Sequence, residues 1–340
     1  MEYLMSARIA INGFGRIGRL VLRSLFEMKK KSNLEIVAIN ASGSLEGCAM
    51  LLQRDSIHGE FTHKVEVNKN CLRINSENIQ YISDRDPSNL PWESLDIDIV
   101  LECTGKFTTH DAASQHIDSG AKKVLVSAPV KNADKTIVYG VNHQQLTSED
   151  RIVSNSSCTT NCLAPLAYVL NKNVGIQKGF MTTVHAYTSD QRSLDNNHSD
   201  PRRARSCHTS IVPTSTGAAK SLSLIIPELS GKLDGTAVRV PIPNVSMVDM
   251  TFLSEQPTTI EDINLSVKTA AETTLKGILG YNNLPLVSID FNHDSHSSYF
   301  DSTQTQVIGE NFVRVLSWYD NEWGFSNRMV DTAIAMTLAN

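Results

Sequence analysis

RIAINGFGRIG, residues 8–18, is the most informative segment of this chain for its fold. Arg8 to Asn12 reads as a buried β-strand, and Arg19 to Met28 has the apolar spacing of an amphipathic helix. Leu34 to Asn40 follows as a second apolar strand. The sequence therefore predicts a βαβ unit with a glycine-rich turn between its first strand and its helix.

The three glycines of this turn each have a physical role. Gly13 permits the tight turn, Gly15 lets backbone N–H groups approach a pyrophosphate, and Gly18 allows helix and strand to pack closely. Because such a pattern also occurs as a purely structural glycine turn, the motif alone is weak. The flanking strands and helix favour a nicotinamide dinucleotide site over that alternative.

Further strands are expected at intervals that suit a doubly wound sheet. Ile97 to Cys103 and Lys123 to Ser127 lead into small residues, which suits a ligand lying across the carboxyl ends of parallel strands. After Cys158 the pattern changes to longer alternating stretches, which favour a mainly antiparallel second domain. These stretches are Gly179 to Tyr187, Thr236 to Val240, Val245 to Leu253 and Phe312 to Tyr319.

The predicted fold class is α/β, with a Rossmann-type doubly wound parallel sheet and an α+β catalytic domain built on a mainly antiparallel sheet. Residues 1–157 are expected to form the dinucleotide-binding domain and residues 158–319 the second domain. The last residues, 320–340, contain a predicted helix from Arg328 to Leu338 and are expected to return to the first domain.

Composition narrows the class of protein. The net charge of -5 argues against nucleic acid or an anionic membrane as a partner. Six cysteines without short, regular spacings favour a reducing cytoplasm over a secreted disulfide scaffold. No apolar run approaches the roughly 18 residues of a spanning helix. The leader Met1 to Met5 is expected to be a short disordered extension, and Lys29 to Lys31 a solvated helix end.

Ser154 to Pro165 places one cysteine, Cys158, among small hydroxyl residues where a helix is about to start. Backbone N–H groups and the positive end of the helix dipole stabilise a thiolate at such a position. Any single cysteine can instead be a small buried hydrophobe. The helix start favours Cys158 as a nucleophile.

A cysteine nucleophile beside a nicotinamide site points to aldehyde oxidation through a thioester. The thiolate adds to the aldehyde, a hydride passes to the nicotinamide, and a second nucleophile releases the acyl group. A base must take the hemithioacetal proton, and His185 lies late in a predicted strand. The local pattern fits a general base and a satisfied core histidine equally well.

Two groups imitate metal sites. Cys158 and Cys162 lie one helical turn apart but offer no complete ligand set, so Cys162 is interpreted as a packed neighbour. Asp290 with the run from His293 to His296 forms no compact ligand set either, and loops rich in Asp, His and Ser are common. No metal is predicted.

At several motifs the chain closely resembles phosphorylating glyceraldehyde-3-phosphate dehydrogenases, over essentially its whole length. The motifs are Ile11 to Arg19, Ser157 to Cys162, Pro213 to Lys220, Arg239 to Pro241 and Trp318 to Gly324. The resemblance implies that Cys158 is the nucleophile and that His185 activates it and serves as general base. It also implies a homotetramer, with residues 158–319 as the catalytic and tetramerisation domain and an arginine-rich loop from Tyr187 to Ser210 between subunits.

The resemblance also implies two phosphate-binding sites. The chemistry agrees, because a phosphorylated aldehyde and an attacking inorganic phosphate need separate anion sites. The resemblance places one site at Thr188, Asp190 and Arg239, and the other at Ser157, Thr159, Arg203, Thr216 and Gly217. Asn321 is expected to hold the nicotinamide carboxamide. The other implied cofactor residues, beside the three glycines, are Arg16, Ile17, Asn40, Ala41, Arg85 and Ser127.

Two positions depart from the family pattern. Ala41 stands where most NAD-dependent members have an aspartate after the second strand, which leaves NAD, NADP or both as cofactors. Phe325 stands where many members have a tyrosine, which removes a hydroxyl but keeps the ring.

Two other functions remain open from the sequence. Ser288 to Asp294 and Asn321 to Phe325 resemble the sister group of erythrose-4-phosphate dehydrogenases, whereas His185 to Thr188 and Thr214 to Ala219 retain the hydroxyls of the glyceraldehyde-3-phosphate enzymes. A non-catalytic dinucleotide sensor with a reactive thiol is the alternative from another class. The combination of Cys158, His185 and the arginines favours an enzyme.

Overall fold

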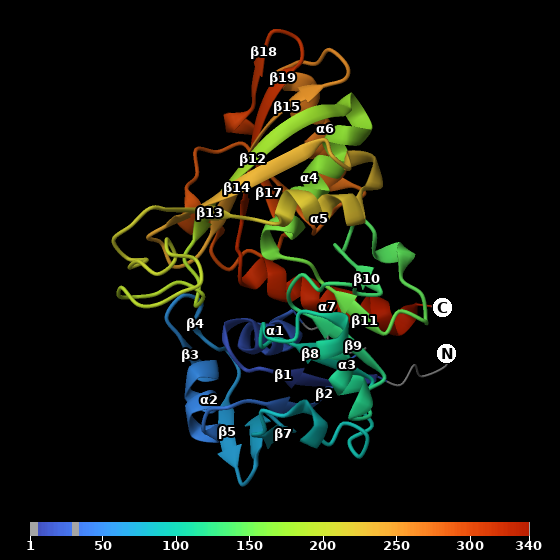
Figure 1. Cartoon of the computed structure of the whole chain (residues 1–340), viewed down its shortest axis with the longest axis vertical. Helices are drawn as coiled ribbons and strands as arrows, with labels where there is room; N and C mark the ends of the chain where they lie inside the picture. Colours follow the sequence, from blue (N-terminus) through green and yellow to red (C-terminus); the bar gives the residue numbers. More distant parts are fainter. Residues whose placement is uncertain (1–5, 29–33, 340) are drawn as a thin grey trace. The chain divides into compact units, whose positions relative to one another are not determined.

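The computed structural model describes residues 6–28 and 34–339. The leader Met1 to Met5 and the Lys29 to Lys31 segment lie outside these residues. Backbone contacts divide the chain into two compact units (Figure 1). Unit 1 takes its residues from Met1–Tyr139, His143–Ser156 and Ser326–Asn340, and unit 2 from Gly140–Asn142 and Ser157–Phe325.

Unit 1 is built on a mostly parallel sheet. All neighbouring pairs from β10 through to β7 are parallel, whereas β7, β6 and β5 form antiparallel pairs at one edge. In spatial order the strands are β10 (Lys135–Thr136), β11 (Ile152–Ser154), β9 (Lys123–Val126), β8 (Ile99–Glu102), β1 (Ala7–Asn12), β2 (Leu34–Asn40), β7 (Glu77–Ile82), β6 (Cys71–Ile74) and β5 (Val65–Asn68).

The helices of unit 1 follow the predicted βαβ pattern. The fingerprint helix α1 (Arg16–Glu27) buries Leu20, Val21 and Leu25 and begins three residues earlier than predicted, with Gly15 as its N-cap. The other helices and the small antiparallel pair are α2 (Leu45–Gln53), α3 (His110–Asp118), α7 (Trp323–Leu338, of which the part from Ser326 belongs to unit 1), β3 (Arg54–Asp55) and β4 (Gly59–Glu60).

Unit 2 is built on a mainly antiparallel sheet. Within it, β12 also runs parallel to β14, and β16 parallel to β17. In spatial order the strands are β13 (Val212–Ser215), β14 (Leu233–Val240), β12 (Ile176–Ala186), β15 (Ser246–Ser254), β19 (Phe312–Tyr319), β17 (Ser298–Asp301) and β16 (Leu279–Asn282), with β18 (Gln306–Ile308) paired to β19.

Helix α4 (Cys158–Val174) begins at Cys158, because the Ser157 side chain accepts a hydrogen bond from the Thr160 N–H and caps the first turn. It packs against β15, β17 and β19 and against both other helices of unit 2 (Figure 1). Those helices are α5 (Ala218–Ile225) and α6 (Ile260–Glu272).

The predicted fold class is therefore confirmed: a mostly parallel Rossmann-type sheet is followed by a mainly antiparallel one. The strands β5, β6 and β7 are not predicted by the sequence pattern. Among the described residues, no helix is long and apolar enough to cross a membrane.

Candidate active site

The glycine turn has the close contacts that its sequence requires. Gly13 has φ +92°, and a Cβ on Gly18 would lie 2.0 Å from the Gly13 carbonyl oxygen, so helix and turn touch there. A Cβ on Gly15 would meet nothing within 4 Å. The turn thus leaves open space at its tip, which fits a pyrophosphate approaching the backbone.

The carboxyl ends of β1, β2 and β8 are joined by a buried polar network. Asn40 Nδ2 donates to Asn12 Oδ1 at 2.7 Å and to the Asp84 carbonyl, and Asn12 Nδ2 donates to Glu102 Oε2 at 2.5 Å. Because both hydrogens of the Asn40 side-chain amide are donated within the protein, this side chain orders the carboxyl ends of the strands at the predicted adenosine site.

No carboxylate replaces the missing aspartate at Ala41 itself. The Ala41 backbone is held by its own N–H, which donates to the Ile82 carbonyl, and by the Tyr81 hydroxyl, which donates to the Ala41 carbonyl. Ser42 and Ser44 are exposed, and Ser44 caps α2. The surface beside Ala41 is thus lined by hydroxyls.

Arg16, a predicted cofactor residue, makes a two-bond ion pair with Asp55. Arg16 Nη1 and Nη2 lie 2.5 Å and 3.1 Å from the two carboxylate oxygens. Burial would raise the pKa of Asp55, but hydrogen bonds from Arg16 and from the backbone of His58 hold that pKa well below its usual range. Asp55 is therefore ionised and holds the Arg16 side chain in place.

The remaining cofactor candidates of unit 1 have different surroundings. Ile17 is half-buried at the start of α1, Arg85 is exposed after β7, and the Ser127 backbone N–H donates to the Glu102 carbonyl just after β9.

Cys158 and His185, 27 residues apart in the chain, lie together in unit 2. Cys158 opens α4 and His185 lies near the end of β12, with 3.5 Å between Sγ and Nε2. This distance is within reach of a sulfur hydrogen bond.

The surroundings of His185 select one tautomer. His185 Nδ1 lies 2.6 Å from the Ala186 carbonyl oxygen, a distance that requires a hydrogen between them. Arg239 Nη1 also lies 2.8 Å from His185 Nδ1, but it directs its hydrogen to the same carbonyl oxygen at 2.9 Å, so the Nδ1 position can carry its own hydrogen. With its proton on Nδ1, His185 presents the lone pair of Nε2 to the Cys158 sulfur.

The charge states follow from burial. Burial and the positive charge of Arg239 lower the pKa of His185 to about 3, so the imidazole is neutral at neutral pH. Burial also raises the pKa of the Cys158 thiol, although Arg239 and hydrogen bonds with Thr159 oppose this rise. His185 therefore faces the Cys158 sulfur as a neutral base, and burial of the thiol opposes the thiolate that the helix start predicts.

Arg239 is the cation nearest this pair. Its Nε is buried and has no hydrogen-bond partner among the described residues, so a donor remains for an anion. Of the residues predicted to share its phosphate site, Thr188 is half-buried just beyond β12 and Asp190 is exposed. Asp190 lies 2.6 Å from Arg203, a member of the other predicted phosphate site, so the structure links the two sets.

The second predicted set is spread over three segments of unit 2. Arg203 Nε donates to Thr214 Oγ1, two residues before Thr216. Gly217 is the N-cap of α5, and a Cβ there would meet nothing within 4 Å. Ser157 caps α4, and Thr159 Oγ1 lies 2.9 Å from the Tyr319 hydroxyl, so these two hydroxyls also hold the protein together.

Asn321 lies before α7 and is 6% exposed. Its Oδ1 accepts a hydrogen bond from Ser246 Oγ at 2.8 Å. Phe325 is buried within α7.

Three residues at these sites have contacts that the sequence pattern does not predict. Tyr319 is buried between the hydroxyls of Thr159 and Thr183, and its ring meets the His185 ring edge-on. Asp55 and Ser246 hold Arg16 and Asn321. Tyr319 lies in a motif that the family resemblance had already marked, whereas Asp55 and Ser246 carry no local signal.

The metal alternative finds no support in the part of the chain that the structure describes, where no group of three or more His, Cys, Asp or Glu side chains could hold an ion. His296 pairs with Asp294 at 2.8 Å, and His293 stacks on Trp323.

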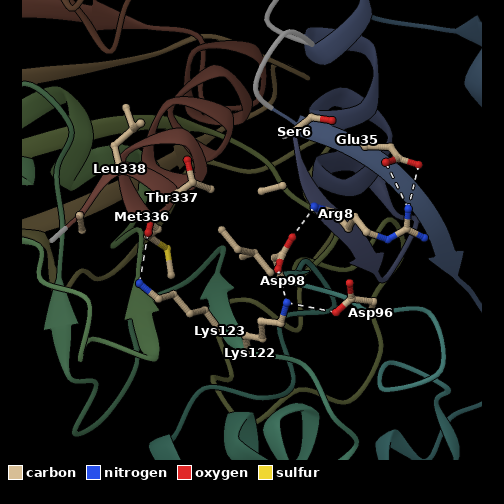
Figure 2. Close-up of a pocket in the computed structure, with 13 residues that line it drawn as sticks. Ser6, Arg8, Glu35, Asp96, Asp98, Lys122, Lys123, Met336, Thr337 and Leu338 are labelled. Carbon is tan, nitrogen blue, oxygen red and sulfur yellow. Dashed lines mark hydrogen bonds and ion pairs between the residues drawn. The ribbon is translucent and has the colours of Figure 1, made fainter. Parts of the chain in front are cut away.

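A cavity of about 760 Å³ lies at the amino ends of β1, β8 and β9 (Figure 2). The glycine turn follows the opposite, carboxyl end of β1. Its charged side chains are paired: Arg8 with Glu35, and Lys122 with Asp96 and Asp98. Lys123 donates to the Met336 carbonyl. Each of these charged side chains thus has a partner within the protein, and none of the predicted site residues lines the cavity.

Comparisons with known proteins agree with this arrangement. The family description "glyceraldehyde 3-phosphate dehydrogenase, NAD binding domain" matches residues 7–110, and "glyceraldehyde 3-phosphate dehydrogenase, C-terminal domain" matches residues 157–321. Similar proteins include the glyceraldehyde-3-phosphate dehydrogenases of Xanthobacter flavus, 56% identical over 98% of this chain and 99% of the relative, and of Zymomonas mobilis, 55% identical over the same shares.

Glyceraldehyde-3-phosphate dehydrogenase 2 of Bacillus subtilis is 51% identical over 96% of both chains. Three observations agree on the family. They are the open space at the tip of the glycine turn, the contact between Cys158 and a neutral His185, and the matches over nearly the whole chain. The chain belongs to the glyceraldehyde-3-phosphate dehydrogenase family.

Proposed function

We propose that this enzyme oxidises glyceraldehyde 3-phosphate to 1,3-bisphosphoglycerate with a nicotinamide dinucleotide and inorganic phosphate, as a step of glycolysis. The observation that carries the proposal is the contact of 3.5 Å between Cys158 Sγ and His185 Nε2 beside Arg239. It supplies a nucleophile, a base and an anion-binding cation at one place.

The reaction begins when the Cys158 sulfur attacks the aldehyde carbon and its proton passes to His185 Nε2. The imidazolium that forms is stabilised by the Ala186 carbonyl, which accepts its Nδ1–H. That proton then neutralises the hemithioacetal oxygen.

In the oxidation step His185 Nε2 removes the proton from the hemithioacetal hydroxyl, and the C–O bond becomes a carbonyl. A bound nicotinamide supplies the hydride acceptor. The product on the protein is a thioester at Cys158. An oxygen of inorganic phosphate then attacks the thioester carbonyl, the C–S bond breaks, and Cys158 leaves as a thiolate that takes back the proton held on His185 Nε2.

Arginines hold the two phosphates. Arg239, with its unused Nε donor, and Thr188 form the first site, and Asp190 contributes by orienting Arg203. Arg203, Thr216 and Gly217 form the second site, together with the hydroxyls of Ser157 and Thr159. Asn321 binds the nicotinamide carboxamide, and Gly13, Gly15, Arg16, Ile17, Gly18, Asn40, Ala41, Arg85 and Ser127 line the dinucleotide.

The test is a steady-state assay with glyceraldehyde 3-phosphate and erythrose 4-phosphate, each with and without phosphate. We expect a higher kcat/KM for glyceraldehyde 3-phosphate and a strong dependence on phosphate. A higher value for erythrose 4-phosphate would assign the chain to the sister activity, and no turnover of either aldehyde would favour the dinucleotide sensor.

The enzyme uses NADP as well as NAD. Ala41 offers no carboxylate to repel a 2′-phosphate, and exposed Ser42 and Ser44 supply hydroxyls instead. Glu46 is also exposed nearby, which limits the expected NADP affinity. Comparing kcat/KM for the two dinucleotides tests this proposal.

The enzyme forms a homotetramer in the cytoplasm, with residues 1–157 and 320–340 as the dinucleotide-binding domain and residues 158–319 as the catalytic and tetramerisation domain. All six cysteines are free, which suits a reducing compartment. Light scattering coupled to size-exclusion chromatography tests the tetramer. A mass near that of one chain, 37.4 kDa, would contradict it.

A further inference from the structure

Two hydrogen bonds join the segment Asn244–Ser246 to the pair Asp320 and Asn321. Asn244 Nδ2 donates to Asp320 Oδ2 at 2.8 Å, and Ser246 Oγ donates to Asn321 Oδ1 at 2.8 Å. The four residues Asn244, Ser246, Asp320 and Asn321 are all buried. The segment therefore holds Asp320 and Asn321, which are separated from α7 by one residue.

The Ser246 hydroxyl has its roles fixed by its two neighbours. The Ala186 backbone N–H donates to Ser246 Oγ at 3.0 Å, so the hydroxyl acts as acceptor toward Ala186. Its own hydrogen is then available for Asn321 Oδ1. The opposite rotamer of the Asn321 amide would place an NH2 group there, and the hydroxyl hydrogen would lose that acceptor.

The consequence is a defined direction for Asn321. With Oδ1 held by Ser246, the Nδ2 group points away from that bond, and it has no hydrogen-bond partner among the described residues. An amide NH2 held in this way donates to a carbonyl oxygen, which is the group that a nicotinamide carboxamide presents.

The backbone before Ser246 is strained. Val245 has φ +65°, a left-handed conformation that is unfavourable for a β-branched residue, and its side chain is buried. Such strain persists only where the surrounding structure imposes it. Here the strained residue lies between Asn244 and Ser246, which bind Asp320 and Asn321.

We propose that Ser246 is a positioning residue for nicotinamide binding, which it controls by fixing the Asn321 amide. The inference rests on the proposed function, in which Asn321 holds the carboxamide. The same hydroxyl also accepts from the residue that follows His185, so one side chain aligns the end of the base-bearing strand and the nicotinamide-binding amide.

The first experiment measures binding by titration calorimetry with NAD and with ADP-ribose, which lacks the nicotinamide. Ser246→Ala is expected to weaken NAD binding about tenfold and to leave ADP-ribose binding within about twofold of wild type. Ser254→Ala is the matched control, because it removes a buried hydroxyl from the other end of β15. It should change neither affinity.

A double-mutant cycle tests whether Ser246 acts through Asn321. The variant Ser246→Ala/Asn321→Ala should bind NAD as weakly as Asn321→Ala alone, because the hydroxyl has nothing left to orient. Ser246→Thr keeps the hydroxyl and should retain NAD affinity. It provides a second test of the role of the hydroxyl where Ser246→Ala is too unstable to measure.

The outcomes separate the two proposals. Multiplying losses in the double variant, or equal weakening of NAD and ADP-ribose by Ser246→Ala, would overturn the role of Ser246. Wild-type protein that binds neither NAD nor NADP would instead overturn the proposed function.

Discussion

Two buried histidines, His116 in unit 1 and His185 in unit 2, have opposite environments. Both ring nitrogens of His116 are occupied: Trp92 Nε1 donates to Nδ1 at 3.1 Å, and Nε2 donates to Glu102 Oε2 at 3.1 Å. His185 is saturated only at Nδ1, and its Nε2 faces a thiol at the longer distance of 3.5 Å. A histidine with both nitrogens satisfied holds a fold together, whereas one with a lone pair aimed at a thiol can accept a proton.

The largest effect is expected from the partner of His185. Cys158→Ser should lower kcat at least 10⁴-fold, because a hydroxyl does not replace the attacking sulfur. Cys162→Ser should stay within about tenfold of wild type. Cys162 is fully buried between Ser298 and the Ser317 carbonyl, and burial raises its pKa to about 12.

Limiting iodoacetamide provides an independent check on this pair. The reagent should label Cys158 before Cys162, as read by peptide mass spectrometry. Full turnover by Cys158→Ser would sink the thioester mechanism.

The matched variants His185→Asn and His116→Asn test whether the first histidine is catalytic and the second structural. His185→Asn should lower the acylation rate by about 10²- to 10⁴-fold and leave the melting temperature close to wild type. His116→Asn should instead cost about 1 to 3 kcal/mol of stability, because Trp92 or Glu102 loses a buried partner. Stopped-flow kinetics and thermal unfolding measure the two effects, and an exchange of the two results would refute the distinction.

Ala41→Asp is expected to act on cofactor choice and not on chemistry. A carboxylate at this position repels a 2′-phosphate and accepts from ribose hydroxyls, so kcat/KM for NADP should fall at least tenfold while NAD is retained. The measurement is the ratio of kcat/KM for the two dinucleotides. A wild-type preference for NAD above about a thousandfold, or roughly 4 kcal/mol, would mean that another group enforces the discrimination.

The smallest effect is expected from Asp55→Asn, which removes the charge beside Arg16. We expect a loss of about 1 to 3 kcal/mol in stability and a severalfold higher KM for NAD. The pKa of Asp55 is depressed in the folded state, so its contribution is fully present above the unfolded pKa, about 4, and is lost as the pH falls below it. Between pH 5 and 3, the melting temperature should therefore fall more steeply for wild type than for Asp55→Asn.

Local patterns made the fold and the helix start at Cys158 predictable. The glycine turn and its flanking apolar strands lie within a few residues of one another, and so do Ser157 and the start of α4. The edge strands β5 and β6 were missed because their short, half-exposed residues show little apolar patterning.

Long-range partners could not be read from the sequence. Ser246 and Asn321 are 75 residues apart, and Arg16 and Asp55 are 39 apart, so no periodicity connects them. The charge states also depended on tertiary structure, because the local argument for a thiolate at Cys158 contained no term for burial.

The proposal that Cys158 is the nucleophile and His185 its base is tested by the burst of reduced dinucleotide in a stopped-flow experiment without phosphate. Without phosphate the thioester at Cys158 accumulates, so the burst reports acylation alone. We expect a fast burst in wild type and in Cys162→Ser, a burst slowed at least about 100-fold in His185→Asn, and none in Cys158→Ser. A burst in His185→Asn at the wild-type rate would contradict the role of His185 and place the base elsewhere.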